Sequence, residues 1–286
     1  MPADLGVLID DLTAETAVLR QMLAPLTAAD WQRATPAPGW TISDQVSHLA
    51  HFDQVAVASA TDPDRFAAEA AGAGAADPDA IAARYHQMTA ADLADWFGRS
   101  RAELLSAFAG LDPARRVPWF GPPMSVASAL TARLMETWAH GQDVADTVGV
   151  QRAPTHRLRH VAHIGVGARA YSYAASRLPM SAKPVRVELV APSGELWTWG
   201  PASAADRITG PAIDFCLLVT QRRHRADTAV EATGPAAGQW LAIAQAFAGP
   251  PGPGREPGQF AGRGLESAPG DLSSVDVQDL PGNERR

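Results

Sequence analysis

Four long segments in the first 150 residues carry apolar side chains every three or four positions, which is the period of an amphipathic helix. These segments span residues 4–26, 41–60, 81–108 and 125–148. Each predicted helix has to bury its apolar face against another element, so four of them in succession predict a four-helix bundle. We predict a flexible connector at residues 61–78 and a loop at residues 113–123.

The ends of these helices carry local signals. Residues 35–40 contain two prolines and a glycine, which cannot continue a helix, and Thr41 with Asp44 three positions on resembles a capping box. Ser125 is predicted to begin the last of the four helices, and Gly149 is predicted to end it. The predicted bundle therefore has defined starts and stops.

The pattern changes in the second half of the chain. One more helix is predicted from 155 to 178, and the alternation at 185–190 and 196–199 predicts a β-hairpin. Residues 207–209 are predicted as a short strand, and residues 211–219 and 239–247 as helices. We therefore predict an α+β protein with three regions. They are a helical bundle (1–178), a smaller α+β domain (179–248) and a disordered tail rich in Gly and Pro (249–286).

Composition excludes several classes of function. Lys183 is the only lysine and precedes a proline, which fits neither a phosphate-binding Gly-Lys loop nor a Schiff-base enzyme. Cys216 is the only cysteine, so no internal disulfide or Cys-rich zinc site can form, and its apolar neighbours predict a buried, inert thiol. A net charge of −7 argues against nucleic-acid binding. No apolar run reaches membrane-spanning length and the N-terminus is acidic, so we expect a cytoplasmic protein.

The strongest chemical signal is a Glu and a His four residues apart. Glu136 and His140 share one face of a predicted helix, and His48 on another bundle helix can point at them across the core. Two imidazoles and one carboxylate suit zinc or another divalent transition metal, and three protein ligands leave one position open, as in catalytic sites. His51, one turn from His48, is a competing ligand. Asp143 is either an orienting partner of His140 or a solvated residue.

Structural explanations compete with these assignments. A Glu/His pair at this spacing is common on solvated helix faces, and a single His48 is more often a core histidine than a ligand. Three further histidines at helical spacing could form a second metal cluster, but their arginine neighbours favour a solvated face. These are His156, His160 and His163. The tryptophans at 40, 96, 138, 197 and 199 are predicted to pack in the core and the hairpin rather than to form a ligand cage.

Two strings resemble the metal-binding pattern of the DinB-like superfamily. They are GWTISDQVSHLAHFD (39–53) and, about 90 residues later, ETWAHGQDV (136–144). Within that superfamily the chain is most similar to the mycothiol-dependent maleylpyruvate isomerase group. The resemblance implies that His48, Glu136 and His140 are the metal ligands, and the group does not require a histidine where His51 stands.

The resemblance extends to the C-terminal half. Isomerase-type members carry a small α+β domain with a helix that ends in an arginine relevant to activity, and GPAIDFCLLVTQRR (210–223) matches with Asp214 and Arg222. Because Arg223 and Arg225 follow closely, the assignment to Arg222 is open to Arg223. This region also resembles segments named for wyosine base formation. Together these likenesses cover roughly residues 1–248.

The resemblance implies an enzyme whose divalent metal activates a low-molecular-weight thiol, with zinc as the first candidate for that metal. In actinobacteria that thiol is mycothiol, which is expected to act in isomerisation of, or S-transfer to, a small electrophile. Arg222 is expected to steady a substrate carboxylate. Two alternatives remain open: a DinB-like metal-binding protein without catalysis, and an accessory of tRNA modification of the wyosine type.

Overall fold

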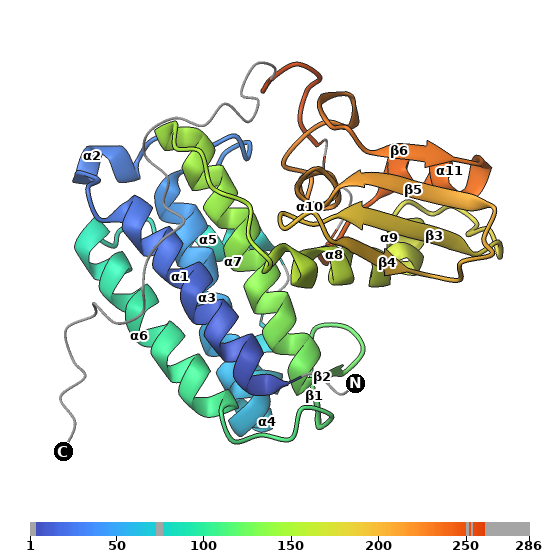
Figure 1. The fold of residues 1–286 in the computed structure, drawn as a ribbon. Coiled ribbons are helices and arrows are strands. Elements are labelled where there is room, and N and C mark those ends of the chain that lie inside the picture. The colour runs from blue at the N-terminus through green and yellow to red at the C-terminus, as the bar shows by residue number, and fades with distance from the viewer. Residues whose placement is uncertain (1–3, 73–76, 250–251, 253, 261–286) are drawn as a thin grey trace.

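The computed structural model describes residues 4–72, 77–249, 252 and 254–260. A helical N-terminal region lies beside a C-terminal unit built on a sheet (Figure 1), so the predicted α+β fold class is confirmed. The helices of the N-terminal region are α1 (Leu5–Leu23), α2 (Ala28–Trp31), α3 (Ile42–Thr61), α4 (Pro63–Ala70), α5 (Pro78–Ala83), α6 (Ala90–Phe108) and α7 (Val126–Val148). Among the helices described, none is long and apolar enough to cross a lipid bilayer.

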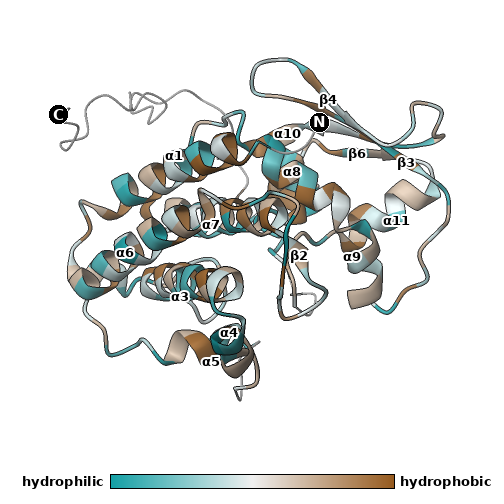
Figure 2. Ribbon diagram, turned by 90° about the horizontal axis from the view of Figure 1, so that it is seen from below, coloured by the Kyte–Doolittle hydropathy of each residue, from teal (hydrophilic) through white to brown (hydrophobic). Residues whose placement is uncertain are grey.

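The long helices α1, α3, α6 and α7 form the predicted bundle, with polar and apolar residues mixed along each of them (Figure 2). Their predicted caps are present. The Thr41 hydroxyl accepts from the Asp44 amide while the Asp44 carboxylate accepts from the Thr41 amide, which closes the capping box of α3. Ser125 caps α7, and Gly149 ends it in the left-handed conformation with φ 76°.

Several predicted elements differ in detail. The predicted helix 81–108 is two helices, α5 and α6, because Thr89 starts α6 by accepting from the Asp92 amide. The predicted connector 61–78 contains α4, which Asp62 caps ahead of Pro63. The predicted loop 113–123 contains a short strand, β1 (Arg116–Val117), which pairs antiparallel with β2 (Met124–Ser125) directly after the loop.

The C-terminal sheet has the order β4-β3-β5-β6. Its strands are β3 (Val185–Val190), β4 (Leu196–Trp199), β5 (Asp206–Pro211) and β6 (Glu231–Thr233). The predicted β3–β4 hairpin is confirmed, β5 runs parallel to β3, and β6, which the sequence did not indicate, pairs antiparallel with β5.

The C-terminal half also contains helices. They are α8 (Leu158–Gly167), α9 (Arg169–Ala175), α10 (Ala212–Val219), the 3-10 helix η1 (Arg225–Asp227) and α11 (Pro235–Ile243). Of these, α10 and α11 contact the strands of this sheet. The single helix predicted at 155–178 is therefore broken at Ala168, and the helix predicted at 239–247 begins earlier, with Pro235 in its first turn.

One continuous apolar cluster joins the bundle to the C-terminal unit. Helix α8 contacts both α7 and α10, and it approaches α10 so closely at Gly165 that a Cβ there would lie 2.7 Å from a methyl carbon of Val219. Helix α9 packs against α11. The core therefore crosses the region where a domain boundary is predicted, and a boundary at residue 178 stays a prediction.

Most of the predicted tail lies outside the described residues. The described residues 254–260 pack against the rest of the protein: the Arg255 guanidinium is buried beside Asp143, and the Arg223 guanidinium lies 3.8 Å from the centre of the Phe260 ring. The chain after residue 249 therefore contributes at least one buried contact to the bundle.

A buried ion-pair network connects the four long helices. The carboxylate of Asp53 on α3 accepts from Arg101 of α6 at 2.7 Å and from Arg133 of α7 at 3.0 Å. Arg101 also donates to the hydroxyls of Thr16 on α1 and Thr137 on α7. All three charged side chains are at most 4% exposed. The network therefore fixes how the four helices are positioned along one another.

We expect Asp53→Asn to lower the free energy of unfolding by about 3–5 kcal/mol, because two buried guanidiniums lose the carboxylate that they share. Urea denaturation measures this loss. Asp95→Asn on the exposed face of α6 is the matched control and should change stability little. A loss for Asp53→Asn no larger than for this control would contradict the structural role of the network.

Candidate metal centre

The side chains of His48, Glu136 and His140 meet between α3 and α7. Nε2 of His140 lies 3.1 Å from Oε2 of Glu136, and Nε2 of His48 lies 3.6 Å from the same oxygen. One ligand atom from each residue lies within 4.8 Å of the other two. In the described part of the chain, this is the one group of three or more His, Cys, Asp or Glu side chains spaced to share a metal ion. The three candidate ligands thus converge as expected.

The charge states of these residues suit metal coordination. Burial, together with the nearby His140, lowers the pKa of His48 to about 3, so its imidazole is neutral near pH 7. Burial alone would raise the pKa of Glu136, but hydrogen bonds with His140 and His48 outweigh it and hold that pKa well below its usual range. A neutral imidazole and an ionised carboxylate are the forms that bind a cation.

Gln45 orients His140, a role that the sequence did not indicate. Its side-chain oxygen lies 2.5 Å from Nδ1 of His140, and its amide nitrogen donates to the Thr35 hydroxyl, which in turn donates to the Trp40 carbonyl. Because the amide nitrogen is committed to Thr35, the amide oxygen faces His140 and accepts the Nδ1 proton. Nε2 is therefore the nitrogen of His140 that would bind a cation beside Glu136 and His48. The available signal was a polar residue one turn before His48 on α3.

Asp143 does neither of the two things expected of it. It is fully buried, and its carboxylate accepts from Arg222 at 2.8 Å and from Arg255 at 2.6 Å rather than from His140. Both expectations, an orienting partner of His140 and a solvated residue, are therefore wrong. The reason is that two cations from the C-terminal part of the chain reach this turn of α7.

Arg222, the predicted substrate-binding arginine, lies beside the candidate metal centre. It is held on Asp143 and also donates to the backbone oxygen of Ala139, the residue before His140. Asp143 is about 4.5 Å further along the helix axis than His140. The neighbouring Arg223 pairs with Asp146 instead. Of the two arginines that the sequence left open, Arg222 therefore has the contacts closer to the ligand set.

Aromatic rings cover part of the centre. The Trp40 ring lies 5.4 Å from the His48 ring and 5.8 Å from the His140 ring, and Phe52 lies 4.6 Å from His48. The prediction that Trp40 packs in the core is wrong, because the loop before α3 lays it over the two histidines and Asp79 accepts its indole N–H. The tryptophans at 96, 138 and 197 are buried, as predicted.

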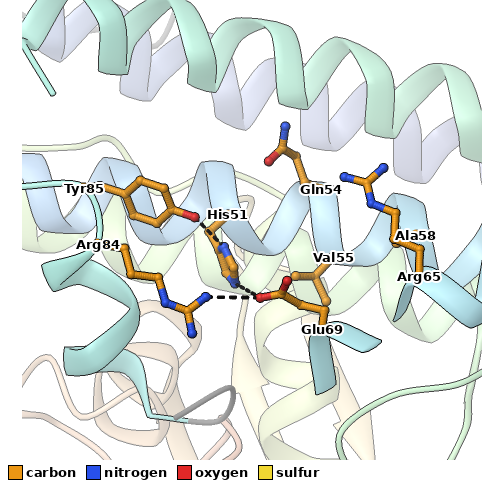
Figure 3. A pocket seen from close by; sticks show the side chains of 8 residues that line it. All are labelled: His51, Gln54, Val55, Ala58, Arg65, Glu69, Arg84 and Tyr85. Atoms are coloured by element: carbon orange, nitrogen blue, oxygen red, sulfur yellow. Dashed lines mark hydrogen bonds and ion pairs between the residues drawn. The ribbon is translucent and has the colours of Figure 1, made fainter. Parts of the chain in front are cut away.

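His51 faces away from the ligand set. Its Nδ1 lies 2.8 Å from the Tyr85 hydroxyl, and its Nε2 is directed toward Glu69 (Figure 3). The structure therefore places His51 on a different side of α3 from His48. Cys216 is fully buried, and burial raises the pKa of its thiol, as expected of an inert cysteine.

The histidines of α8 and the turn before it are not simply solvated. His156 and His160 lie 2.9 Å and 2.7 Å from the two carboxylate oxygens of Asp11 on α1, and His163 accepts from the Trp199 indole at 3.4 Å. The predicted solvated face is therefore wrong for His160, whose ring is mostly covered at this junction.

These features define a class: a DinB-like helical bundle with a His/Glu/His candidate metal centre and an α+β unit attached to it. Residues 12–145 match the mycothiol maleylpyruvate isomerase N-terminal domain, and residues 181–233 match the segment called wyosine base formation. Two curated proteins of Mycobacterium tuberculosis, both named uncharacterized, are 50% identical over 260 residues, which covers 88% of this chain and 100% of each of them. The chain therefore belongs to their family, and its residues 12–145 carry the mycothiol maleylpyruvate isomerase N-terminal domain.

Solved structures share the fold. The crystal structure of the mycothiol-dependent maleylpyruvate isomerase matches with a TM-score of 0.58, and that of its histidine-to-alanine mutant matches with 0.56. Each is 16% identical and covers 82% of this chain and 96% of the isomerase. At this identity the likeness shows that the fold is the same.

We expect Gln45→Ala to weaken zinc binding about 10–100-fold, because His140 loses the acceptor that holds its ring and its tautomer. Competition with a chelator of known affinity measures this change. Gln21→Ala, on the exposed side of α1, is the matched control and should bind zinc like the wild type. Equal zinc affinity in the Gln45 and Gln21 variants would show that Gln45 does not orient a ligand.

Proposed function

We propose that the protein is a metal-dependent enzyme that uses a low-molecular-weight thiol, mycothiol, for isomerisation of, or S-transfer to, a small electrophile. The observation that carries this proposal is the convergence of His48, Glu136 and His140 on a space smaller than 5 Å. A divalent cation bound there, zinc in the first place, would lower the pKa of a coordinated thiol and make it nucleophilic near neutral pH.

The protein's own residues would supply position and environment. His48, Glu136 and His140 would hold the cation, and Gln45 fixes the orientation of His140. Trp40 and Phe52 pack against the histidine rings and would limit the access of water from that side. Three protein ligands leave a further coordination position, which a catalytic centre needs and a structural one does not.

Arg222 would bind a carboxylate of the substrate. Its partner Asp143 is shared with Arg255, so one carboxylate stands between two guanidiniums and a net positive charge remains beside the candidate centre. A planar guanidinium matches a carboxylate with two parallel hydrogen bonds. This local charge supports an anionic electrophile.

The proposal predicts metal-dependent turnover of an activated cis double bond or another electrophile in the presence of mycothiol. We expect His140→Ala and His48→Ala to lose both the bound metal and turnover, because each variant removes one of three ligands. His51→Ala should keep the metal, since His51 faces Tyr85 and Glu69. Elemental analysis of protein purified without a histidine tag and a mycothiol-dependent rate assay measure these outcomes.

Two results would redirect the assignment. Retained metal with no turnover across several electrophiles would indicate a metal-binding protein without catalysis. Retention on tRNA at physiological salt would favour the wyosine-type role, for which the match of residues 181–233 is the support and the net charge of −7 is the objection. Loss of metal in His51→Ala but not in His48→Ala would overturn the ligand assignment.

For Arg222 we expect Arg222→Gln to raise KM for a carboxylate-bearing electrophile about tenfold or more, since a charge-assisted hydrogen bond to the substrate is lost. A neutral electrophile should show no such change in KM. Arg223→Gln, which removes the pair with Asp146, is the matched control and should leave KM unchanged. Steady-state kinetics with the two electrophiles separate a substrate contact from a general effect on folding.

A further inference from the structure

A polar cavity of about 120 Å³ lies between α3, α4 and α5. Its charged and hydrogen-bonding walls are His51, Arg65, Glu69, Arg84 and Tyr85. Figure 3 shows Tyr85, His51, Glu69 and Arg84 joined by dashed lines, with the Arg65 side chain apart from them. None of the three candidate metal ligands lines it. The cavity is therefore separate from the candidate metal centre, although both adjoin α3.

The innermost wall of this cavity holds a polar atom without a hydrogen-bond partner. The His51 side chain is only 7% exposed, and in the described part of the chain its Nε2 makes no hydrogen bond. The nearest carboxylate oxygen, on Glu69, is 3.7 Å away. A buried polar atom left unsatisfied costs free energy, so its position points to a ligand or to solvent in the cavity.

The size of the cavity favours a ligand over a single bound water. One bound water needs about 10–15 Å³ on this measure, so the cavity holds roughly ten times that volume. A single bridging water would leave most of the space unfilled. A small organic molecule of a few heavy atoms matches the space better.

The charges around the cavity select an anion. Arg84 and Glu69 pair at 3.2 Å, whereas among the described residues the side chain of Arg65 has no ion-pair partner. Burial lowers the pKa of His51 to about 4, so its imidazole is neutral near pH 7. Two guanidiniums and one carboxylate therefore leave one net positive charge on the lining, which one negative charge on a ligand would neutralise.

We propose that this cavity is a binding site for a small monocarboxylate. One carboxylate oxygen accepts from Nε2–H of His51, and the other accepts from the guanidinium of Arg65. In this binding mode the Tyr85 hydroxyl, 2.8 Å from Nδ1 of His51, donates to that nitrogen, so that the imidazole proton is on Nε2 and available to the ligand. The site is independent of metal binding and of the proposed thiol chemistry.

Isothermal titration of the metal-loaded, full-length protein with sodium propionate tests this site, with sodium chloride at equal ionic strength as the reference. We expect one propionate per chain and about tenfold or weaker binding in Arg65→Gln, because a charge-assisted hydrogen bond is lost. Arg99→Gln, on the exposed face of α6, is the matched control and should bind propionate like the wild type. Arg65 is itself exposed, so its variant should fold normally.

A carboxylate could also bind a metal ion directly, and the His140→Ala variant separates the two sites. We expect propionate binding to persist in His140→Ala, and propionate to shift the His51 ring resonances in wild-type NMR spectra. Binding that is lost in His140→Ala and kept in Arg65→Gln would assign the carboxylate to the metal and overturn the proposal. Absence of binding, or binding unchanged in Arg65→Gln, would overturn it as well.

Discussion

The buried pairing of Asp53 with Arg101 and Arg133 is the constraint on which the arrangement of the bundle depends. Desolvating three charged groups is unfavourable unless their geometry is held closely, so the network tolerates little sliding of one helix along another. Asp53 is five residues after His48 on α3, and Arg133 is three residues before Glu136 on α7. The same register that satisfies the ion pairs therefore also brings the candidate ligands together.

Successive turns of helix α7 direct side chains toward different parts of the protein. Arg133 faces the buried network, Glu136 and His140 face α3, and Asp143 faces the C-terminal arginines. Gln45 completes the set from α3 by holding His140. On α7 the ligands Glu136 and His140 therefore lie between two buried ion pairs. Arg133 pairs with Asp53 before them, and Asp143 pairs with Arg222 after them, which gives the ligands little freedom to move.

Local features of the sequence predicted local features of the structure. The apolar period, the Thr41 and Asp44 cap and the terminal Gly149 each depend on neighbours a few residues away, and all were confirmed. Glu136 and His140 could be paired by spacing for the same reason, while adding His48 to them rested on the bundle and on family resemblance. The break between α5 and α6 was missed because the apolar period continues across it, although Thr89 supplies a new cap.

Contacts between segments far apart in the chain could not be predicted from these local patterns. The partners in these contacts are separated by 48 residues or more of chain: Asp53 from its two arginines, Gln45 from His140, and Asp11 from His156 and His160. Nothing in the spacing of one segment indicates which charge on another will reach it. For Asp143 the local pattern even suggested the wrong partner, His140. The arginines that neutralise its carboxylate, Arg222 and Arg255, follow it by 79 and 112 residues.

That separation has a consequence during synthesis. Arg222 and Arg255 follow Asp143 by 79 and 112 residues, so the ribosome releases the complete set of bundle helices well before either counter-charge has been made. At the usual elongation rate of about 5–20 residues per second, the nascent bundle spends several seconds with an unneutralised carboxylate on α7. The full set of contacts of Asp143 beside the candidate metal centre can therefore form only after translation has passed residue 255.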